Sequence, residues 1–246
     1  MFNFFTKKNY LVDYLDGFVD IHNHILPGLD DGAKTVEDSI SLLKGMGEFG
    51  ITNFICTPHI MDNYYPNDID TIKSSYKKLE KSLPENSLDD VKIDFAAEHM
   101  IDSNFENLLD LNQIIPLAKS YILVEMSYLQ ASINFESSLE KIKEKGLFPI
   151  LAHPERYVFL HTYFNKYNVI KNKGILFQLN LLSLSDYYGK EVKKIALKLL
   201  DKGLIDFVAS DVHNLQQINH LKEIKLNKHE LDSIEPLIEK TKYNFS

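Results

Sequence analysis

Residues 17–24 read GFVDIHNH, a short apolar run that ends in two histidines separated by one residue. Residues two apart in an extended segment point to the same side, so His22 and His24 can offer two imidazoles to one ion at the end of a strand. An isolated pair of this kind is often an incidental surface feature. Whether this pair marks a metal site therefore depends on what stands at the ends of the other strands.

Short β-rich runs alternate with stretches of helical spacing along the rest of the chain. The β-rich runs predict seven strands, at residues 18–22, 53–57, 91–97, 121–125, 148–152, 175–180 and 206–210. Helical spacing, capping residues and terminal glycines predict helices at residues 35–49, 68–83, 134–145, 187–202 and 228–242. This alternation is typical of parallel βα units in an α/β fold. Seven units fit a distorted, closed or nearly closed (β/α)7 barrel better than an open three-layer sheet, although periodicity alone leaves both possible.

Six of the seven predicted strands end at or next to a possible metal ligand. These residues are His22 and His24, His59, Glu98, Glu125, His153, and Asp211 with His213. The carboxyl ends of parallel barrel strands meet on one face, where this fold places its chemistry. Each residue alone could be a solvated strand end or a turn cap. Their occurrence at so many strand ends predicts a multinuclear metal centre.

The types of ligand indicate the metal and the chemistry. Imidazole and carboxylate without thiolate suit manganese, iron or zinc, and eight or nine ligands are too many for one ion. Two or three ions a few ångströms apart would polarise a phosphoryl group, lower the pKa of a bridging water and stabilise an in-line displacement. Hydrolysis of a phosphate ester is therefore the expected reaction.

The 27 basic residues of the chain are 26 lysines and one arginine, Arg156. This arginine follows His153 by three residues. A guanidinium fork fits two phosphate oxygens in a way that a lysine point charge does not, so Arg156 is predicted to clamp the phosphate. The alternative is a structural arginine that pairs with Glu155 or with a helix end.

Composition limits the remaining possibilities. A length of 246 residues without a flexible linker predicts one domain at residues 17–246, preceded by an extension at residues 1–16. The net charge of −8 argues against a nucleic-acid footprint. One cysteine, no apolar run of ~20 residues and no signal peptide predict a cytoplasmic protein without a transmembrane segment. The aromatic opening at residues 1–8 is interpreted as a loosely packed tail, with a membrane or partner contact as the alternative, and the oligomeric state stays open.

The sequence resembles the PHP (polymerase and histidinol phosphatase) superfamily, and within it the bacterial manganese-dependent protein-tyrosine phosphatases of the CpsB/CapC type, which are encoded beside capsule and exopolysaccharide genes. The resemblance spans nearly the whole chain. It rests on DIHNH at 20–24, GLDDG at 28–32, TPH at 57–59, AE at 97–98, VE at 124–125, AHPERY at 152–157 and ASDVHN at 209–214. It implies a PHP barrel whose metal site lies at the carboxyl ends of the strands.

The resemblance also implies how the ligands are shared among three ions. The first ion would be held by His22, His24, Glu98 and Asp211, the second by Glu98, Glu125 and His153, and the third by Asp31, His59 and His213. Glu98 becomes the bridging carboxylate, and Asp31 enters the set from the resemblance alone. Catalysis would involve Arg156, Glu98 and Asp211. The implied metal is Mn²⁺, with Fe or Zn as alternatives, and the implied partner is a phosphotyrosine protein such as an autophosphorylating bacterial tyrosine kinase.

The chain departs from this family at two loops. Several relatives carry further basic residues after the histidines matching His59 and His213, but here the segments read IMDNYY at 60–65 and NLQQI at 214–218. The clamp is therefore predicted to depend on Arg156 and the metals, while Asp62, Tyr64 and Tyr65 either shape the rim or pack as ordinary loop residues. The preference for phosphotyrosine depends most on these loops.

Other functions stay as alternatives or are excluded. A cysteine-dependent phosphatase needs an arginine six residues after its nucleophile, but Asp62 stands there relative to Cys56. His99 adjoins Glu98 but is expected to point away from the ligands, because neighbouring strand residues face opposite sides. A histidinol-phosphate or other small-molecule phosphatase is the alternative enzyme. A noncatalytic, metal-holding interaction module is the alternative of another class.

Overall fold

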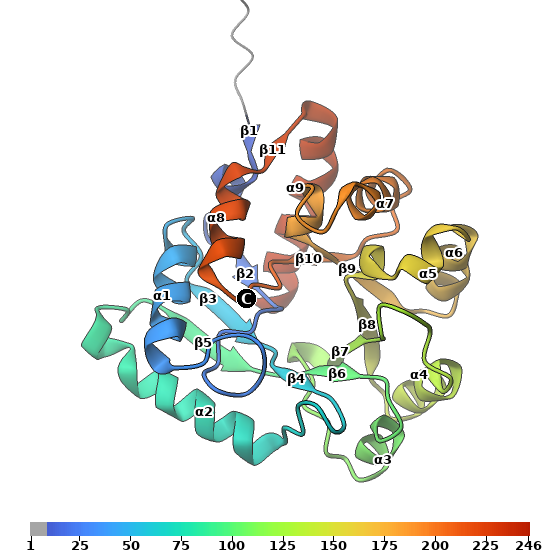
Figure 1. Cartoon of the computed structure of the whole chain (residues 1–246), viewed down its shortest axis with the longest axis horizontal. Coiled ribbons are helices and arrows are strands. Elements are labelled where there is room, and N and C mark those ends of the chain that lie inside the picture. The colour runs from blue at the N-terminus through green and yellow to red at the C-terminus, as the bar shows by residue number, and fades with distance from the viewer. Residues whose placement is uncertain (1–8) are drawn as a thin grey trace, which may run out of the picture.

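A computed structural model describes residues 9–246, without the side chain of Lys119. The strands are β1 (Asn9–Tyr10), β2 (Val19–Asp20), β3 (Asn53–Cys56), β4 (His59–Ile60), β5 (Lys92–Phe95), β6 (Glu98–Met100), β7 (Tyr121–Glu125), β8 (Phe148–Ala152), β9 (Leu176–Asn180), β10 (Phe207–Ala209) and β11 (Lys225–Leu226). The helices are α1 (Val36–Gly47), α2 (Ile69–Ser82), α3 (Phe105–Asp110), α4 (Phe135–Glu144), α5 (Val158–His161), α6 (Asn165–Asn172), α7 (Lys190–Asp201), α8 (Leu215–Glu223) and α9 (Lys228–Phe245). Figure 1 shows the helices arranged around the outside of the strands.

The seven predicted strands are present as β2, β3, β5, β7, β8, β9 and β10, and the five predicted helices as α1, α2, α4, α7 and α9. Helix α1 begins with the expected capping box. The Asp38 N–H donates to the Thr35 hydroxyl, and the Thr35 N–H donates to the Asp38 carboxylate. The sequence did not predict the short helices α3, α5, α6 and α8. It also did not predict that the second and third strands continue, after short interruptions, as β4 and β6.

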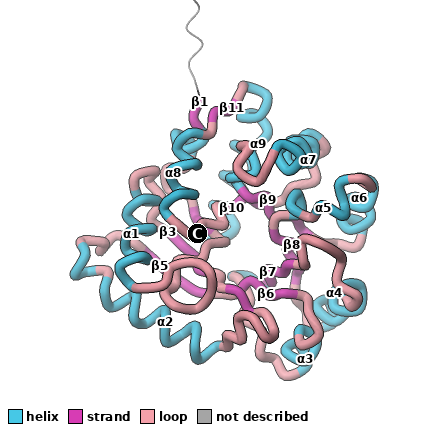
Figure 2. The backbone as a smooth tube through the Cα atoms, in the orientation of Figure 1, coloured by secondary structure: helices cyan, strands magenta, loops and turns pink. Residues whose placement is uncertain are grey.

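The main strands are parallel and form two sheets. Figure 2 shows these strands surrounded by helices and loops. One sheet has the order β10-β9-β8-β7-β6-β4 and the other the order β2-β3-β5. The sheets meet where Asn23 and Val212 form an isolated parallel bridge, beside a hydrogen bond of 2.8 Å from the Asp211 N–H to the His22 carbonyl. The α/β class and the parallel strands are confirmed, whereas closure into one barrel stays a prediction.

Alternating side chains of the strands belong to two separate apolar clusters, and this alternation positions the functional residues. In β7, Leu123 joins an inner cluster with Ile150 and Phe207, while Ile122 and Val124 belong to the larger cluster that includes the helices. A parallel strand covered on both faces is expected to be apolar on both. Residues two apart share a face, so Glu125 follows Leu123 on the inner side, at the carboxyl end of β7.

The first described residues are attached to the rest of the fold. Strand β1 pairs with β11 in antiparallel register, and the Leu11 N–H donates to the Ile224 carbonyl at 2.9 Å. Leu11 and Leu15 are fully buried. The tail predicted at residues 1–8 lies outside the described residues, and the domain boundary after residue 16 stays a prediction. In the part of the chain that the structure describes, no helix combines the length and apolar character needed to cross a bilayer.

Candidate metal centre

The structure brings all nine predicted metal ligands together on one side of the parallel strands. Glu125 ends β7 and His153 directly follows β8, whereas His59 and Glu98 begin the short strands β4 and β6 that follow β3 and β5. Within each of four overlapping groups, the potential ligand atoms lie within 4.8 Å of one another. The groups are His24, Asp31, His59 and His213; His22, His24 and Asp211; His22, Glu98 and His153; and His59, Glu98 and Glu125. Seven of these residues are buried, whereas His213 is partly buried and Asp31 is exposed.

The Glu98 carboxylate lies at the centre of the cluster. Its Oε2 is 3.2 Å from His22 Nε2 and 3.0 Å from His59 Nδ1, and its Oε1 is 3.0 Å from His153 Nε2. Burial raises the pKa of Glu98, but the charges at His22 and His59 outweigh this effect and hold it well below the ordinary value. Glu98 is therefore an anionic acceptor shared by several imidazoles, as a bridging ligand must be.

The Asp211 carboxylate, like that of Glu98, lies close to more than one imidazole. Its Oδ1 is 3.3 Å from His22 Nε2 and 3.4 Å from His24 Nε2. Both Asp211 and His153 have left-handed backbones, with φ of 52° and 33°. Non-glycine residues adopt this region at an energetic cost, and such strain is concentrated at functional sites. Both strained residues follow the end of a strand, and the side chains of both belong to the cluster.

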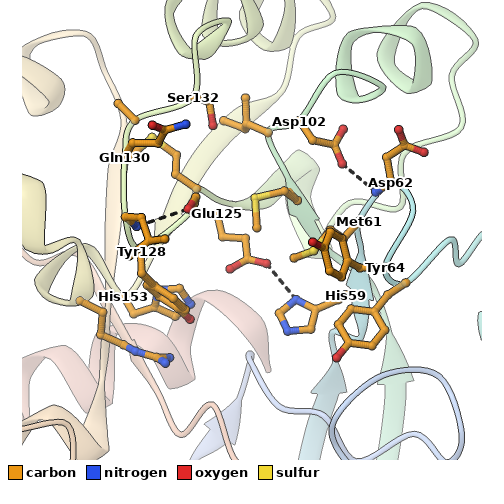
Figure 3. A pocket seen from close by; sticks show the side chains of 18 of the residues that line it. His59, Met61, Asp62, Tyr64, Asp102, Glu125, Tyr128, Gln130, Ser132 and His153 are labelled. Carbon is orange, nitrogen blue, oxygen red and sulfur yellow. Dashed lines mark hydrogen bonds and ion pairs between the residues drawn. The ribbon is translucent and has the colours of Figure 1, made fainter.

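His59 connects two parts of the cluster. Its Nε2 is 3.5 Å from Asp31 Oδ1, which is also 3.5 Å from His213 Nε2. Its Nδ1 lies 2.9 Å from Glu125 Oε1, an interaction drawn in Figure 3. His59 thus faces both the Asp31–His213 pair and the Glu98–Glu125 pair, so its assignment to the third ion alone stays a prediction.

Two residues that the sequence analysis missed orient the first histidine pair. Gln178 Oε1 lies 2.8 Å from His22 Nδ1, and Asp30 Oδ2 lies 2.7 Å from His24 Nδ1. A partner on Nδ1 fixes the tautomer and leaves the Nε2 lone pair for an ion. Gln178 lies on β9, the predicted strand without a terminal ligand, and a polar residue inside such a buried strand was the available signal.

Buried polar atoms without hydrogen-bond partners test whether metal ions fit here. His59 Nδ1, Glu98 Oε2 and Glu125 Oε1 have no hydrogen bond with acceptable geometry among the described residues, although the imidazole nitrogen lies within about 3 Å of both oxygens. An unsatisfied buried polar group costs about 1–3 kcal/mol. These nitrogen and oxygen atoms lie close together with free lone pairs and without hydrogen bonds. Such a set of donor atoms fits divalent cations.

Arg156 lies beside this cluster, in the short 3-10 helix Pro154–Arg156. Its Nη1 donates to Asp211 Oδ2 at 2.8 Å. The guanidinium carbon lies 4.4 Å from the ring centroid of Tyr128 and 4.2 Å from that of Tyr188. Among the described residues Glu155 does not form the alternative ion pair. Its Oε1 accepts hydrogen bonds from the Asn180 N–H and the Ser183 hydroxyl, and its Oε2 is buried without a partner. Arg156 is thus held by two tyrosine rings next to a predicted ligand.

A cavity of about 1270 Å³ opens above the cluster. Figure 3 shows His59, Glu125 and His153 along its floor, Asp62 and Tyr64 on one side, and Tyr128 and Gln130 on the other. The ring of Tyr65 stacks on that of His59, with centroids 5.4 Å apart and planes 12° apart. Arg156 also lines the cavity. Asp62, Tyr64 and Tyr65 therefore shape the rim, which was one of the two expectations for this loop.

His99 lies away from the ligands, as expected. Its Nδ1 is 3.3 Å from the Leu123 carbonyl, and its Nε2 accepts a hydrogen bond of 3.2 Å from the Ile115 N–H. Burial lowers its pKa to about 4, so the ring is neutral and serves the packing of the strands.

Comparison with known proteins identifies the family. The family model for capsular polysaccharide synthesis proteins, CpsB/CapC, matches residues 18–225. The chain belongs to the CpsB/CapC family. Its CpsB/CapC relatives include the tyrosine-protein phosphatase YwqE of Bacillus subtilis, which is 33% identical over 83% of this chain and 81% of YwqE. The tyrosine-protein phosphatase CpsB of Streptococcus agalactiae is 30% identical over 80% of this chain and 83% of CpsB.

A solved structure of the CpsB/CapC type supports the same assignment. It comes from work on YwqE of Bacillus subtilis and CpsB of Streptococcus pneumoniae, described as metal-dependent tyrosine phosphatases. The TM-score is 0.80 at 28% identity, with 92% of this chain and 94% of that chain covered. The likeness therefore extends over nearly the whole fold.

Proposed function

We propose that this chain is a metal-dependent protein-tyrosine phosphatase that uses manganese. The observation that carries the proposal is the cluster of nine imidazole and carboxylate side chains at the floor of a cavity lined by the single arginine of the chain. Relatives in the CpsB/CapC family are named tyrosine-protein phosphatases. A phosphotyrosine protein is the substrate, and an autophosphorylating bacterial tyrosine kinase is the proposed partner.

The cluster would hold two or three ions. One set consists of His22, His24, Glu98 and Asp211, a second of Glu98, Glu125 and His153, and a third of Asp31, His59 and His213. The overlapping groups of potential ligand atoms and the unpaired atoms of His59, Glu98 and Glu125 support this arrangement. When bound, the ions supply Lewis-acid polarisation of the phosphoryl oxygens and activation of a water for attack.

The side chains around the cluster bind and orient the substrate. Arg156 binds nonbridging phosphate oxygens through the guanidinium donors that do not contact Asp211. Gln178 and Asp30 keep the Nε2 atoms of His22 and His24 turned inward. Tyr65, stacked on His59, offers an aromatic face to the phenyl ring of the substrate.

Cys56 takes no part in this reaction. Its thiol is fully buried in the core, and burial raises its pKa well above the usual range. A buried neutral thiol is a poor nucleophile, so the proposed hydrolysis does not pass through a cysteinyl phosphate.

The fold of this proposed enzyme is one distorted (β/α)7 barrel. The parallel bridge between Asn23 and Val212 supports closure, because it joins the segment after β2 to the segment after β10. The Ser210 N–H and hydroxyl also donate to the Asp20 carboxylate, at 2.9 and 2.6 Å. These contacts link the two sheets beside the predicted metal ligands.

The test compares substrates on the manganese-loaded chain. Hydrolysis of a phosphotyrosyl peptide is measured against histidinol phosphate and a phosphoseryl peptide, with and without a chelator. We expect the phosphotyrosyl peptide to be hydrolysed with the highest kcat/KM and the activity to disappear on chelation. A higher kcat/KM for histidinol phosphate would favour a small-molecule phosphatase. Hydrolysis of no phosphate ester by fully loaded protein would favour a noncatalytic role.

A further inference from the structure

The charged residues around the cavity are distributed unevenly. Apart from Arg156 and the predicted metal ligands, every charged residue that lines it is acidic: Asp62, Asp102 and Glu106. Among the described residues no lysine lines the cavity, although the chain contains 26 lysines among its 27 basic residues. A site for a doubly negative phosphate thus has a rim that repels anions.

Two of these carboxylates form a pair on one wall. Asp102 Oδ2 accepts a hydrogen bond of 2.7 Å from the Asp62 N–H, an interaction drawn in Figure 3. Asp102 Oδ1 also accepts from the N–H groups of Asn104 and Phe105 at the start of α3. Neither Asp62 nor Asp102 forms an ion pair with a described residue within 4.0 Å, whereas Glu106 is paired with Lys141. Asp62 Oδ2 accepts a hydrogen bond of 2.9 Å from the Asn63 side-chain amide. No described cation therefore neutralises the pair, and both residues line the cavity.

The loop after β7 adds exposed apolar side chains to the same rim. Leu129 is 88% exposed and Ile133 is fully exposed, and both line the cavity. On the opposite wall Tyr64 is 77% exposed. Large apolar side chains gathered around one opening usually mark a surface that a ligand covers.

The cavity is larger than a phosphorylated tyrosine needs. Pockets for whole drug-sized ligands measure roughly 300–1,000 Å³. The volume of about 1270 Å³ leaves room for the residues next to a phosphotyrosine. Those neighbours would contact the apolar loop on one side and the carboxylate pair on the other.

We propose that the rim selects phosphotyrosyl segments whose neighbouring residues are apolar and positively charged, with apolar side chains against Leu129 and Ile133 and a lysine or arginine beside Asp62 and Asp102. The inference rests on the proposed phosphotyrosine phosphatase function. A cation supplied by the substrate offsets the repulsion between rim and phosphate, whereas an acidic neighbour adds to it. The rim therefore favours substrates with a basic residue beside the phosphotyrosine and disfavours substrates with an acidic one.

The charge half of the proposal is tested with two phosphotyrosyl peptides that differ only in lysine or glutamate beside the phosphotyrosine. For the manganese-loaded wild type, we expect kcat/KM to be about two- to fivefold higher for the lysine peptide. This ratio falls toward one in Asp62→Asn, in Asp62→Asn/Asp102→Asn and in the wild type at about 1 M salt. Asp232→Asn, which removes an exposed charge on α9 away from the cavity, keeps the wild-type ratio.

The apolar half uses Leu129→Ser. This variant raises KM for a peptide with an apolar residue beside the phosphotyrosine more than for a peptide with serine there. Equal changes of KM for both peptides would show that Leu129 does not contact the apolar residue.

The outcomes separate this inference from the proposed function. If p-nitrophenyl phosphate and both charged peptides are hydrolysed but the wild type does not distinguish the peptides, the rim proposal is wrong and the phosphatase function stands. The same conclusion follows if the ratio is unchanged in the double variant. If no phosphate ester is hydrolysed, the proposed function itself fails and the inference fails with it. Because the salt dependence needs no variant, misfolding of the variants cannot hide the result.

Discussion

Arg156 and Asp211 are joined by a hydrogen bond of 2.8 Å from Nη1 to Oδ2, at the boundary between the predicted metal cluster and the cavity. The other carboxylate oxygen of Asp211 lies close to the imidazoles of His22 and His24. One carboxylate therefore links the guanidinium to both imidazoles. Burial lowers the pKa of Arg156, but the neighbouring tyrosines and Asp211 outweigh this effect and raise it. The guanidinium is thus a permanent charge in a defined position, which is what a phosphate clamp requires.

Replacing this guanidinium by an ammonium tests the clamp. We expect Arg156→Lys to reduce kcat/KM for a phosphotyrosyl peptide by about 10- to 100-fold, because a charge-assisted bond to phosphate is lost while the charge stays. The assay is done with manganese, and the metal content of the variant is measured to exclude loss of the ions. Equal activity in wild type and variant would show that Arg156 is not the clamp.

The rings of Tyr128 and Tyr188 are expected to hold the plane of this guanidinium. Tyr128→Leu removes one cation–π contact and should raise the inhibition constant of inorganic phosphate by about 3- to 30-fold. Tyr128→Phe keeps the ring, loses a hydroxyl for which no hydrogen bond is described, and serves as the matched control. In the Arg156→Lys background the effect of Tyr128→Leu should shrink. An undiminished effect there would mean that Tyr128 acts independently of Arg156.

The sequence predicted the metal ligands near the strands better than the residues around them, because the spacing of residues along a strand follows a simple geometric rule. Period-two alternation and parallel strands are local rules, and together they bring Glu98, Glu125 and His153 to one face. Asp31 lies in a loop without such a rule and was named only through the family resemblance. Tyr188 reaches Arg156 from a distant segment, and this tertiary contact has no spacing signature in the sequence.

The same distinction applies to the fold. The seven strands and five longer helices have apolar patterns long enough to be recognised. In contrast, α5 has four residues and β4 has two, which is too short to show any period. After β3 the chain passes through Thr57 and Pro58 before β4 pairs with β6 in the other sheet. Pro58 has no N–H to continue the ladder, but only the structure shows where the pairing resumes.

Asp30 and Gln178 should control metal affinity without contacting the ions. Asp30→Asn weakens the 2.7 Å interaction with His24 Nδ1 and loosens the orientation of the imidazole ring. We expect the manganese dissociation constant to rise by about 10- to 100-fold, and Gln178→Leu to have a similar effect through His22. Direct manganese titration measures this, with the exposed Asp13→Asn as the charge-matched control. Wild-type affinity in both variants would contradict the orienting role.

Glu155 should make the stability of the fold depend on pH. Its side chain is fully buried, and burial raises its pKa from 4.5 to about 7. Between these values the folded protein retains a proton that the unfolded chain releases, so the free energy of unfolding falls as pH rises through this window. The loss is about 3 kcal/mol once pH exceeds the folded pKa.

Glu155→Gln tests this dependence, because glutamine keeps an oxygen acceptor for the Asn180 N–H and the Ser183 hydroxyl but cannot ionise. Urea unfolding with the metal chelated should show a smaller decrease of stability for the variant than for the wild type between about pH 5 and 7. Above about pH 8 the variant should be the more stable of the two, since the wild type then carries a buried charge with one unpaired oxygen. Parallel pH profiles for the two proteins would mean that Glu155 titrates at the same pH in the folded and unfolded states.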